Sequence, residues 1–322
     1  MREFPINRND SGQRLDKYLA KALPSLPPSL RSKYIRLKRI KVNGKRCEAN
    51  YRLAEGDVLQ LYINDEFFTA PDPEQAWRKI TPNIHIIYED EHILLCDKVP
   101  GMVVHEDETG TDNTLINHIK AHLHHTGAWD PEQEASFTPA LCNRIDRNTG
   151  GIVIAAKTAA ALRIMNEKIR NREISKYYLC LVHGIPPKKE GKLTGYITRD
   201  TDKKQVTVSR TPVPGALTAQ MKYKLLGSRM DISLLECELL TGRTHQIRAQ
   251  MASMGLPLVG DTKYGTAQRN RGLPFSHQAL YSYRLVFSFT TPSGELEYLT
   301  DREFRVDKVP FVDYFNSLPK LR

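Results

Sequence analysis

The sequence is poor in the features that mark a membrane, secreted or cofactor-dependent protein. No apolar run in its 322 residues approaches the roughly 20 that a membrane-spanning helix needs. The first ten residues, MREFPINRND, lack the apolar stretch of a secretory signal. The five cysteines are scattered without a Cys-x-x-Cys pair, which argues against structural zinc and favours a reducing compartment. We therefore expect a cytoplasmic protein with no membrane segment.

Nucleotide-cofactor motifs are missing as well. Neither a Rossmann fingerprint nor a P-loop nor a Cys/His cluster with metal-ligand spacing occurs in the chain. The helix expected over 114–123 does carry His118 and His122 four residues apart, but no glutamate accompanies them as in a zinc-protease motif. We interpret this region as a polar, partly exposed helix end, and we expect no metal and no cofactor.

Acidic residues are scarce relative to basic ones, and the formal net charge is +10. The excess is concentrated in residues 12–63, which hold twelve Lys or Arg against four Asp or Glu. Within Arg31–Arg46 there are eight basic residues and no acid. Such a segment suits a polyanionic partner such as RNA. A lysine-rich helix that is merely solvated is the alternative, but acids normally interleave in such a helix.

The basic segment also has the pattern of a small folded unit. Apolar residues at helical spacing over 15–23 predict one helix, and Ser29 predicts the N-cap of a second helix reaching about Ile40. The run Val42-Asn43-Gly44-Lys45 predicts a type I′ hairpin, and residues 57–63 alternate as in a strand. A cationic helix beside a small sheet is an electrostatic footprint for a phosphate backbone.

The rest of the chain predicts a second, larger domain. A proline-containing stretch without clear periodicity follows the basic unit, and strands are then expected over 84–88 and 92–97. We therefore predict a basic domain over 1–66, a linker over 67–83 and a catalytic domain over 84–322.

The stretch Leu141–Lys157 concentrates the candidate chemistry. Its predicted turn holds one acid, Asp146, between Arg144 and Arg147, and two glycines follow at once. A carboxylate between cations should stay ionised, because opposite charges lower its pKa, and this suits a nucleophile or electrostatic stabiliser better than a general acid. The glycines, Gly150 and Gly151, let another strand come close. From this stretch alone, a charged surface hairpin is an equally good interpretation.

The segment NRIDRNTGG within this stretch resembles the central motif of the RluA-type pseudouridine synthases, usually His-Arg-Leu-Asp-Arg-x-Thr-Ser-Gly. Asp146 falls on the family's catalytic aspartate. Asn143, Ile145 and Gly150 stand where the family has histidine, leucine and serine. The resemblance also implies that Arg144 is the arginine that fills the space left by a flipped-out nucleotide, a role that suits a planar guanidinium.

Two further motifs follow in the family's order. The strand expected over 175–183 matches Lys-x-Tyr-x-Ala, with Cys180 for the alanine. Its period-2 alternation places Lys176, Tyr178 and Cys180 on one face, so Tyr178 falls on the family's active-site tyrosine. TGRTHQIRAQM, at the start of a helix expected over 243–254, matches the third motif. There Arg248 falls on the arginine that pairs with the catalytic aspartate.

The resemblance implies the α+β pseudouridine synthase fold, a mixed, mainly antiparallel sheet with flanking helices and a central cleft. The basic unit resembles the small α/β RNA-binding domain first described in ribosomal small-subunit protein S-four. The implied activity is an RNA pseudouridine synthase, an isomerase, and we expect a monomer acting on large-subunit ribosomal RNA. The expected catalytic residues are Asp146, Tyr178 and Arg248, and the expected RNA-binding residues are Arg144, Arg147, Lys176, Arg243, His245, Arg31, Arg36, Lys38, Arg39 and Lys45.

The chemistry of this activity agrees with the missing motifs. Uracil leaves the sugar, turns and is rejoined through carbon, so nothing is oxidised and no group is imported. One carboxylate either stabilises positive character on the sugar or attacks it, and both routes remain open. A retaining glycosidase is a competing class, but it requires a second carboxylate across the bond. Transfer RNA as the substrate and a non-catalytic RNA-binding role in ribosome assembly also remain open.

Overall fold

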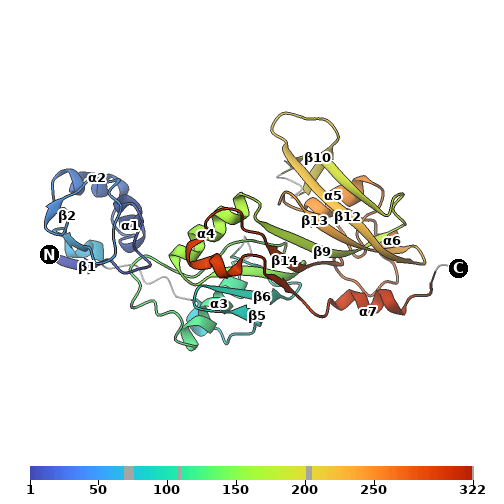
Figure 1. Ribbon diagram of the computed structural model, residues 1–322, viewed down its shortest axis with the longest axis horizontal. Helices are drawn as coiled ribbons and strands as arrows, with labels where there is room; N and C mark the ends of the chain where they lie inside the picture. Colours follow the sequence, from blue (N-terminus) through green and yellow to red (C-terminus); the bar gives the residue numbers. More distant parts are fainter. Residues whose placement is uncertain (69–75, 107–109, 201–204, 321–322) are drawn as a thin grey trace.

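The computed structural model describes residues 1–68, 76–106, 110–200 and 205–320, and a small N-terminal part lies at one end of a larger one (Figure 1). Within residues 1–68, four strands pair in the order β1-β4-β2-β3. Two helices share one apolar core with these strands. These elements are β1 (Arg2–Pro5), α1 (Leu15–Ala22), α2 (Pro28–Arg36), β2 (Ile40–Val42), β3 (Lys45–Arg46) and β4 (Val58–Leu61).

The second predicted helix is placed wrongly at both ends. It begins at Pro28, after the extended Pro27, and no side chain caps it. Proline is favoured at the first helical position because its ring fixes φ near the helical value, so the helix starts before Ser29. It ends at Arg36, since Lys38 takes a left-handed φ of 62° and Ile40 already pairs with β4. The hairpin prediction is confirmed, because Asn43 and Gly44, its two turn residues, both have positive φ. Strand β1 was not predicted.

The predicted linker, 67–83, is described only in part, because residues 69–75 lie outside the described ranges. Its described portion contains the end of one 3-10 turn, η1 (Asp65–Phe68), and the whole of another, η2 (Ala76–Lys79). Trp77 in η2 is buried against Trp129 and His124 of the larger part, with ring centroids 5.2 and 5.1 Å away. This portion is therefore packed onto the larger part, because burial of the large apolar surface of an indole ring is favourable.

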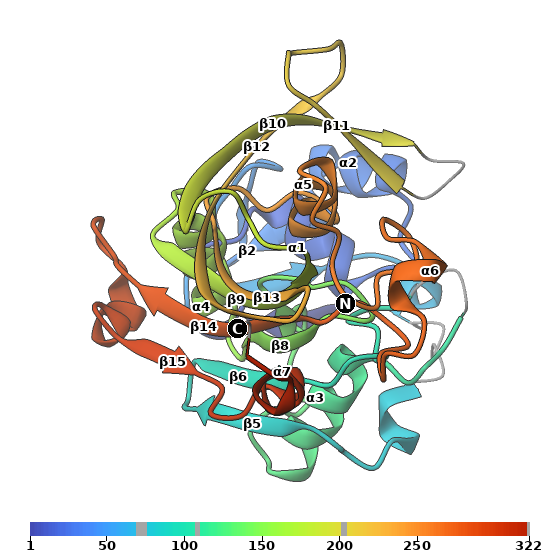
Figure 2. The same ribbon diagram turned by 90° about the vertical axis from the view of Figure 1, so that its right-hand side faces the viewer.

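The larger part is built on one long, curved sheet (Figure 2). Its described strands run in the order β11-β10-β12-β13-β9-β14-β8-β6-β5, with β15 on β14 and β7 on β8. The β14–β8 pair is parallel and the other pairs in this sheet are antiparallel, so the predicted mixed, mainly antiparallel sheet is confirmed. The strands are β5 (His85–Glu89), β6 (Ile93–Lys98), β7 (Ala140–Leu141), β8 (Gly150–Ala156), β9 (Ile174–His183), β10 (Glu190–Asp200), β11 (Gln205–Ser209), β12 (Leu217–Arg229), β13 (Ile232–Leu239), β14 (Leu280–Phe287) and β15 (Glu303–Arg305).

Helices cover both faces of this sheet. The larger part therefore has two apolar cores, one on each face of the sheet. Strand β9 shows the division, because Tyr178 and Cys180 enter the core under α3 and α5, whereas Leu179 and Leu181 enter the core under α4 and α7. The predicted alternation along this strand is confirmed. The helical elements are α3 (Leu115–His125), α4 (Ala159–Arg170), α5 (Gln246–Ser253), α6 (Ala267–Asn270), η3 (Gly294–Leu299) and α7 (Pro310–Ser317). In the part of the chain that is described, no helix has the length and apolarity needed to cross a membrane.

Polar contacts join the small part to the start of α4 and to the segment before β7. Asn9 accepts a hydrogen bond on Oδ1 from the backbone N–H of Ala159 at 3.1 Å, next to the cap that Thr158 provides for the same helix. Gln13 donates to Ser136 at 2.8 Å, and Ser136 in turn donates to the buried Asp10. Because α4 ends at the cleft described below, these contacts connect the basic unit to the candidate site.

Strands β8 and β14 approach each other unusually closely, and two glycines permit it. A Cβ atom at Gly150 would lie 2.3 Å from a ring carbon of Tyr281. A Cβ atom at Gly151 would lie 2.1 Å from the carbonyl oxygen of Ser282, and this glycine has a φ of +112°. No side chain fits at those distances, so the glycine pair sets the spacing of the parallel strands beneath the candidate site.

Replacing Gly150 by serine, the residue usual in the motif, should therefore destabilise this chain by about 1–3 kcal/mol, the usual cost of overpacking. Calorimetric unfolding measures the loss. The control is Gly242→Ser, because nothing lies within 4 Å of a Cβ built there. Combining Gly150→Ser with Tyr281→Leu should cost less than the two single losses summed, since the two side chains compete for one space. Simple additivity would contradict this origin of the close approach.

Candidate active site

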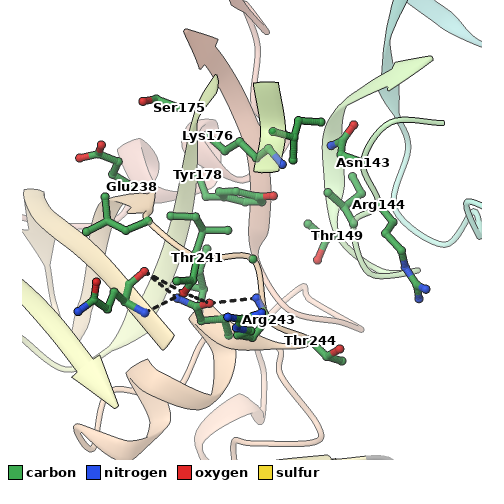
Figure 3. A pocket seen from close by; sticks show the side chains of 18 of the residues that line it. Asn143, Arg144, Thr149, Ser175, Lys176, Tyr178, Glu238, Thr241, Arg243 and Thr244 are labelled. Atoms are coloured by element: carbon green, nitrogen blue, oxygen red, sulfur yellow. Dashed lines mark hydrogen bonds between the residues drawn. The ribbon is translucent and has the colours of Figure 1, made fainter. Parts of the chain in front are cut away.

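A cleft of about 810 Å³ opens across the middle of the large sheet, within the range of about 300–1,000 Å³ typical of ligand sites. One wall is the turn between β7 and β8, which carries Asn143, Arg144 and Thr149 (Figure 3). Lys176 and Tyr178 of β9 face this wall across the cleft. The segment 239–248, between β13 and α5, closes the remaining side. The structure thus brings the three sequence motifs into one cavity.

Arg248 joins two carboxylates at the base of this cleft. Its Nη1 donates to Asp146 Oδ2 at 3.2 Å, while Nε and Nη2 donate to the two oxygens of Asp261 at 2.7 and 3.0 Å. Burial works against the charge of Arg248, but its bonds to the two carboxylates outweigh burial and raise its pKa. Burial likewise opposes ionisation of Asp261, yet the bonds from Arg248 lower the pKa of that carboxyl. The expected contact between Arg248 and Asp146 exists, but the two-pronged bond goes to Asp261.

The arginines beside Asp146 do not pair with it. Arg144 is exposed on the outer side of the turn, where Figure 3 shows its guanidinium pointing away from Tyr178. Arg147 is also exposed and donates from Nε to the carbonyl of Gly101 at 3.1 Å. The cation in contact with Asp146 is thus Arg248, a residue distant in sequence, as the family resemblance implied, and neither of the neighbouring arginines.

The buried side chain of Lys98 holds the turn that carries Asp146 through a hydrogen bond to a carbonyl of that turn. This lysine is 1% exposed, and its ammonium donates to the carbonyls of Val99, Met102 and Arg147 at 3.1, 2.8 and 2.9 Å. Burial lowers the pKa of Lys98 to about 8, and the charge of Asp146 acts in the opposite direction. Three carbonyl acceptors compensate for the burial of this ammonium.

Asn143 takes a structural position in the same turn. Its Oδ1 accepts the backbone N–H of Ile154 at 2.8 Å. The adjacent backbone bond from Cys142 to the carbonyl of Ile154 is also 2.8 Å long. The residue that stands at the motif's usual histidine thus ties the entry strand to β8.

The helix predicted over 243–254 begins three residues later than expected. His245 has a left-handed φ of 52°, a conformation that costs a non-glycine residue about 1–3 kcal/mol, and α5 starts at Gln246. The side chain of Gln246 accepts from Arg243 N–H at 3.0 Å and from the Thr241 hydroxyl at 2.8 Å, which replaces the missing turn of helix. After the helix, Gly255 follows the C-cap residue Met254 and has a φ of +79°, a conformation that glycine adopts readily and that commonly ends helices.

This unusual backbone points the His245 ring into the site. Its Nε2 lies 3.8 Å from Asp146 Oδ2, and its Nδ1 lies 2.9 Å from the hydroxyl of Tyr264. Burial is the main cause that lowers the pKa of His245, while the charge of Asp146 opposes it. The imidazole is therefore neutral at neutral pH.

Tyr178 and Lys176 form the β9 wall. Tyr178 is 6% exposed, and burial, reinforced by the charge of Asp146, raises its pKa to about 12, so its hydroxyl stays protonated. Lys176 is half-buried, and burial lowers the pKa of its ammonium. Among the described residues it has no acidic partner, because the nearby cleft residue Glu238 is bound by Lys222 at 3.0 Å. An ammonium left without a counterion in a cleft suits an anionic ligand group.

The basic residues predicted in the N-terminal part lie outside this cleft, within or directly after α2 and, for one of them, in β3; Figure 1 shows this part at one end of the molecule. Four of them are exposed, Arg31 is half-buried, and Arg39 stacks over Tyr34 with 5.5 Å between guanidinium and ring centroid. Within residues 1–68 none of these five is in an ion pair with an acid, which leaves their charges available to phosphates. The five are Arg31, Arg36, Lys38, Arg39 and Lys45.

The histidines of α3 are more buried than expected. His118 is 7% exposed and bonds to Asn113 and to the backbone N–H of Asn83, at 2.7 and 3.2 Å. His122 bonds to Glu89 at 2.8 Å. The expected partly exposed helix end is thus wrong for His118, whose ring links α3 to the preceding segment. No grouping of side chains in the described ranges has the composition of a metal site.

A cleft lined by the arginine-held Asp146, together with a cationic small domain at one end of the molecule, suits an enzyme that acts on nucleic acid. Two family models match the chain. The model of RNA pseudouridylate synthases matches residues 92–253, and that of the S4 domain matches residues 13–59. The chain therefore belongs to the RNA pseudouridylate synthase family, and it is an RNA pseudouridine synthase, an isomerase.

Related proteins support the same family. The chain is 32% identical over 320 residues to an uncharacterized RNA pseudouridine synthase of Mycoplasma genitalium, covering 97% of this chain and 98% of that protein. It is 30% identical over 286 residues to the ribosomal large subunit pseudouridine synthase C of Vibrio vulnificus, covering 85% of each. The human RNA pseudouridylate synthase domain containing 4 shares the fold, with a TM-score of 0.55 and 19% identity over 72% of this chain and 90% of that one.

Three residues of the site were not predicted. Asp261 and Tyr264 belong to the segment Gly260–Gly265, whose Gly-Asp-x-x-Tyr-Gly pattern is visible in the sequence but does not by itself indicate a role. Lys98 opens the Lys-x-x-Gly turn, which gives no local sign that its side chain reaches the carbonyl of Arg147. All three act through other groups, and residue type alone does not reveal such contacts.

Arg248→Ala should lower the free energy of unfolding by about 3–5 kcal/mol, because it leaves the buried Asp261 without its cation. It should also abolish turnover, and Arg248→Lys should rescue poorly, since lysine lacks the planar fork. Urea unfolding and single-turnover rates measure the two effects. The control is Arg243→Ala, which removes one exposed bond to the Thr218 carbonyl. A larger loss of the chemical step in the control than in Arg248→Ala would contradict the assignment.

Proposed function

We propose that Asp146 is the catalytic carboxylate of this isomerase and that Tyr178 and Arg248 assist it. The supporting observation is the geometry of Asp146, whose Oδ2 is held by Arg248 while its Oδ1 has no hydrogen-bond partner among the described residues. The free oxygen stabilises or attacks C1′ of the sugar as the C1′–N1 bond breaks. Uracil then turns, the C1′–C5 bond forms, C5 loses its proton and N1 gains one, so the reaction is balanced.

The same geometry separates this proposal from glycosidase chemistry. A glycosidase places a second carboxyl group across the scissile bond. In the described lining of the cleft the other acid is Glu238, which is engaged by Lys222. Tyr178 offers a neutral hydroxyl and an aromatic wall in place of that second acid, so the base is retained for rejoining. Free uracil as the product would contradict this proposal.

The remaining cleft residues have proposed RNA contacts. Arg144, exposed at the tip of the turn, takes the place of the target nucleotide when that nucleotide leaves its stack, which costs a few kcal/mol. Lys176 and Arg243 contact the flipped nucleotide or its phosphates, whereas the ring of His245 lies between Asp146 and Tyr264. Arg147 is bound to Gly101, so its main contribution is to the shape of the turn.

We propose large-subunit ribosomal RNA as the substrate. Two observations support this substrate. Two relatives, from two Vibrio species, are named ribosomal large subunit pseudouridine synthase C, and this chain carries an S4 domain. Transfer RNA is the second candidate. The predicted domain limits, 1–66 and 84–322, the monomeric state and the cytoplasmic location stay predictions.

The test maps pseudouridines in RNA from cells that lack this gene and carry either the wild type or Asp146→Asn. Asparagine keeps the size and removes the charge, so we expect the marks to return in large-subunit ribosomal RNA with the wild type alone. In vitro, the variant should retain less than about a tenth of the rate, equivalent to about 1.4 kcal/mol of barrier. Normal unfolding of the variant is the control. Marks missing from transfer RNA alone would move the substrate to the second candidate.

The basic α2 region should contribute to RNA affinity by binding phosphates. The variant Arg36→Gln/Lys38→Gln/Arg39→Gln should bind a ribosomal RNA fragment more weakly. It should also flatten the plot of log affinity against log salt, by about 0.7–0.9 for each phosphate that is no longer neutralised. A matched control is Arg305→Gln/Lys308→Gln/Lys320→Gln, which removes three exposed cations on β15 and around α7. Equal slopes for the two variants would show that α2 does not touch RNA.

A further inference from the structure

His245 lies between a carboxylate and a tyrosine. Its Nε2 faces Asp146 Oδ2 at 3.8 Å, and its Nδ1 is within hydrogen-bond distance, 2.9 Å, of the Tyr264 hydroxyl. The two aromatic rings meet edge to face, with centroids 5.6 Å apart. What His245 does to Asp146 depends on which ring nitrogen carries the hydrogen, and the hydrogen bonds of Tyr264 decide this.

The hydroxyl of Tyr264 has a second neighbour, the backbone N–H of Val206 in β11, at 2.9 Å. A backbone N–H can only donate, so the tyrosine oxygen accepts this bond. Its own hydrogen then needs an acceptor, and His245 Nδ1 is the one within reach among the described residues. If Nδ1 carried the hydrogen, the tyrosine hydrogen would have no acceptor among the residues that the structure describes. The chain of bonds Val206–Tyr264–His245 therefore places the imidazole hydrogen on Nε2, facing Asp146.

We propose that Tyr264 is a positioning residue that locks His245 in the Nε2–H tautomer, so that His245 and Arg248 both direct hydrogens at Asp146 Oδ2 and leave Oδ1 to react. The proposal rests on the proposed role of Asp146. In the other tautomer the lone pair of Nε2 would face the carboxylate and repel it. At 3.8 Å the contact is longer than a hydrogen bond, and such catalytic contacts commonly shorten when substrate binds.

The segments that hold this chain of bonds are themselves tied together. Asp261 accepts the backbone N–H groups of Lys263 and Tyr264, at 2.8 and 3.1 Å, and so fixes the tyrosine relative to Arg248. The side chain of Gln205, next to Val206, donates to the Lys263 carbonyl at 3.0 Å. Besides Asp146 and Tyr264, the titratable groups that act on the ring are Arg248, Asp261 and Lys263. One loop thus positions both donors to Asp146.

The tautomer can be read without RNA, from the nitrogen resonances of the chain labelled with 15N-histidine. The sequence has ten histidines, and the His245 signals are those missing in His245→Gln. At neutral pH we expect Nε2 to carry the hydrogen in the wild type and the two tautomers to mix in Tyr264→Phe. Tyr314→Phe is the control, because that ring packs on Phe275 away from the cleft. Hydrogen on Nδ1 in the wild type would overturn the proposal, whatever the fate of the proposed function.

Two amide variants test the consequence for the reaction. Glutamine can place an amide N–H near the position of Nε2, whereas asparagine reaches only the position of Nδ1. Single-turnover rates at saturating enzyme should fall less than about tenfold in His245→Gln and about a hundredfold or more in His245→Asn, a difference of about 1.4 kcal/mol for each tenfold. Unfolding curves control for stability. Equal rates, or a faster asparagine variant, would overturn the proposal, whereas a wild type without pseudouridine product would instead overturn the proposed function.

Discussion

The site depends on one cation shared by two carboxylates. Arg248 is almost fully buried, and a buried guanidinium is tolerated only where acids and hydrogen bonds compensate for its lost hydration. Asp261 supplies two of the three bonds and Asp146 supplies one. The contact joins the helix α5 and the nearby loop Gly260–Gly265 to the turn before β8, whose Asp146 lies 102 positions from Arg248 in the chain. The position of Asp146 is therefore set by three segments rather than by its own turn alone.

This sharing also separates two kinds of charge within the cleft. With both carboxylates ionised, the group of Asp146, Asp261 and Arg248 carries one net negative charge at the base. The surrounding lining carries cations such as Arg144, Lys176 and Arg243. Phosphates are attracted to this lining, whereas positive charge that develops on the sugar is stabilised at the base. A substrate that is anionic outside and transiently cationic at its reacting carbon matches both zones.

Much of this arrangement could be predicted from the sequence where the information is local. The alternation along β9 gave the right face for Tyr178, and the Asn43-Gly44 pair gave the hairpin, because strand periodicity and turn chemistry act over a few residues. The predicted start of α5 was wrong. The side chain of Gln246 accepts the hydrogen bonds of residues 241 and 243 in place of a first helical turn, and the rules for helix starts do not anticipate such contacts.

Long-range contacts explain the other misses. We predicted that Arg248 pairs with Asp146 alone. Nothing in the sequence indicates that Asp261, thirteen positions after Arg248, accepts two of its hydrogen bonds. Likewise, Trp77 looked like part of a polar linker, because its stacking partner Trp129 lies more than fifty residues away. Such contacts exist only once the sheet has assembled.

The contact between Gly150 and Tyr281 also limits which pairs of residues the two positions accept together. In this backbone a serine at 150 and the tyrosine at 281 compete for the same space, because a Cβ atom would lie 2.3 Å from the ring. With Tyr281 in place, a side chain at position 150 strains the sheet, whereas a smaller residue at position 281 would leave room for one. Amino-acid preferences at these two positions are therefore contingent on each other.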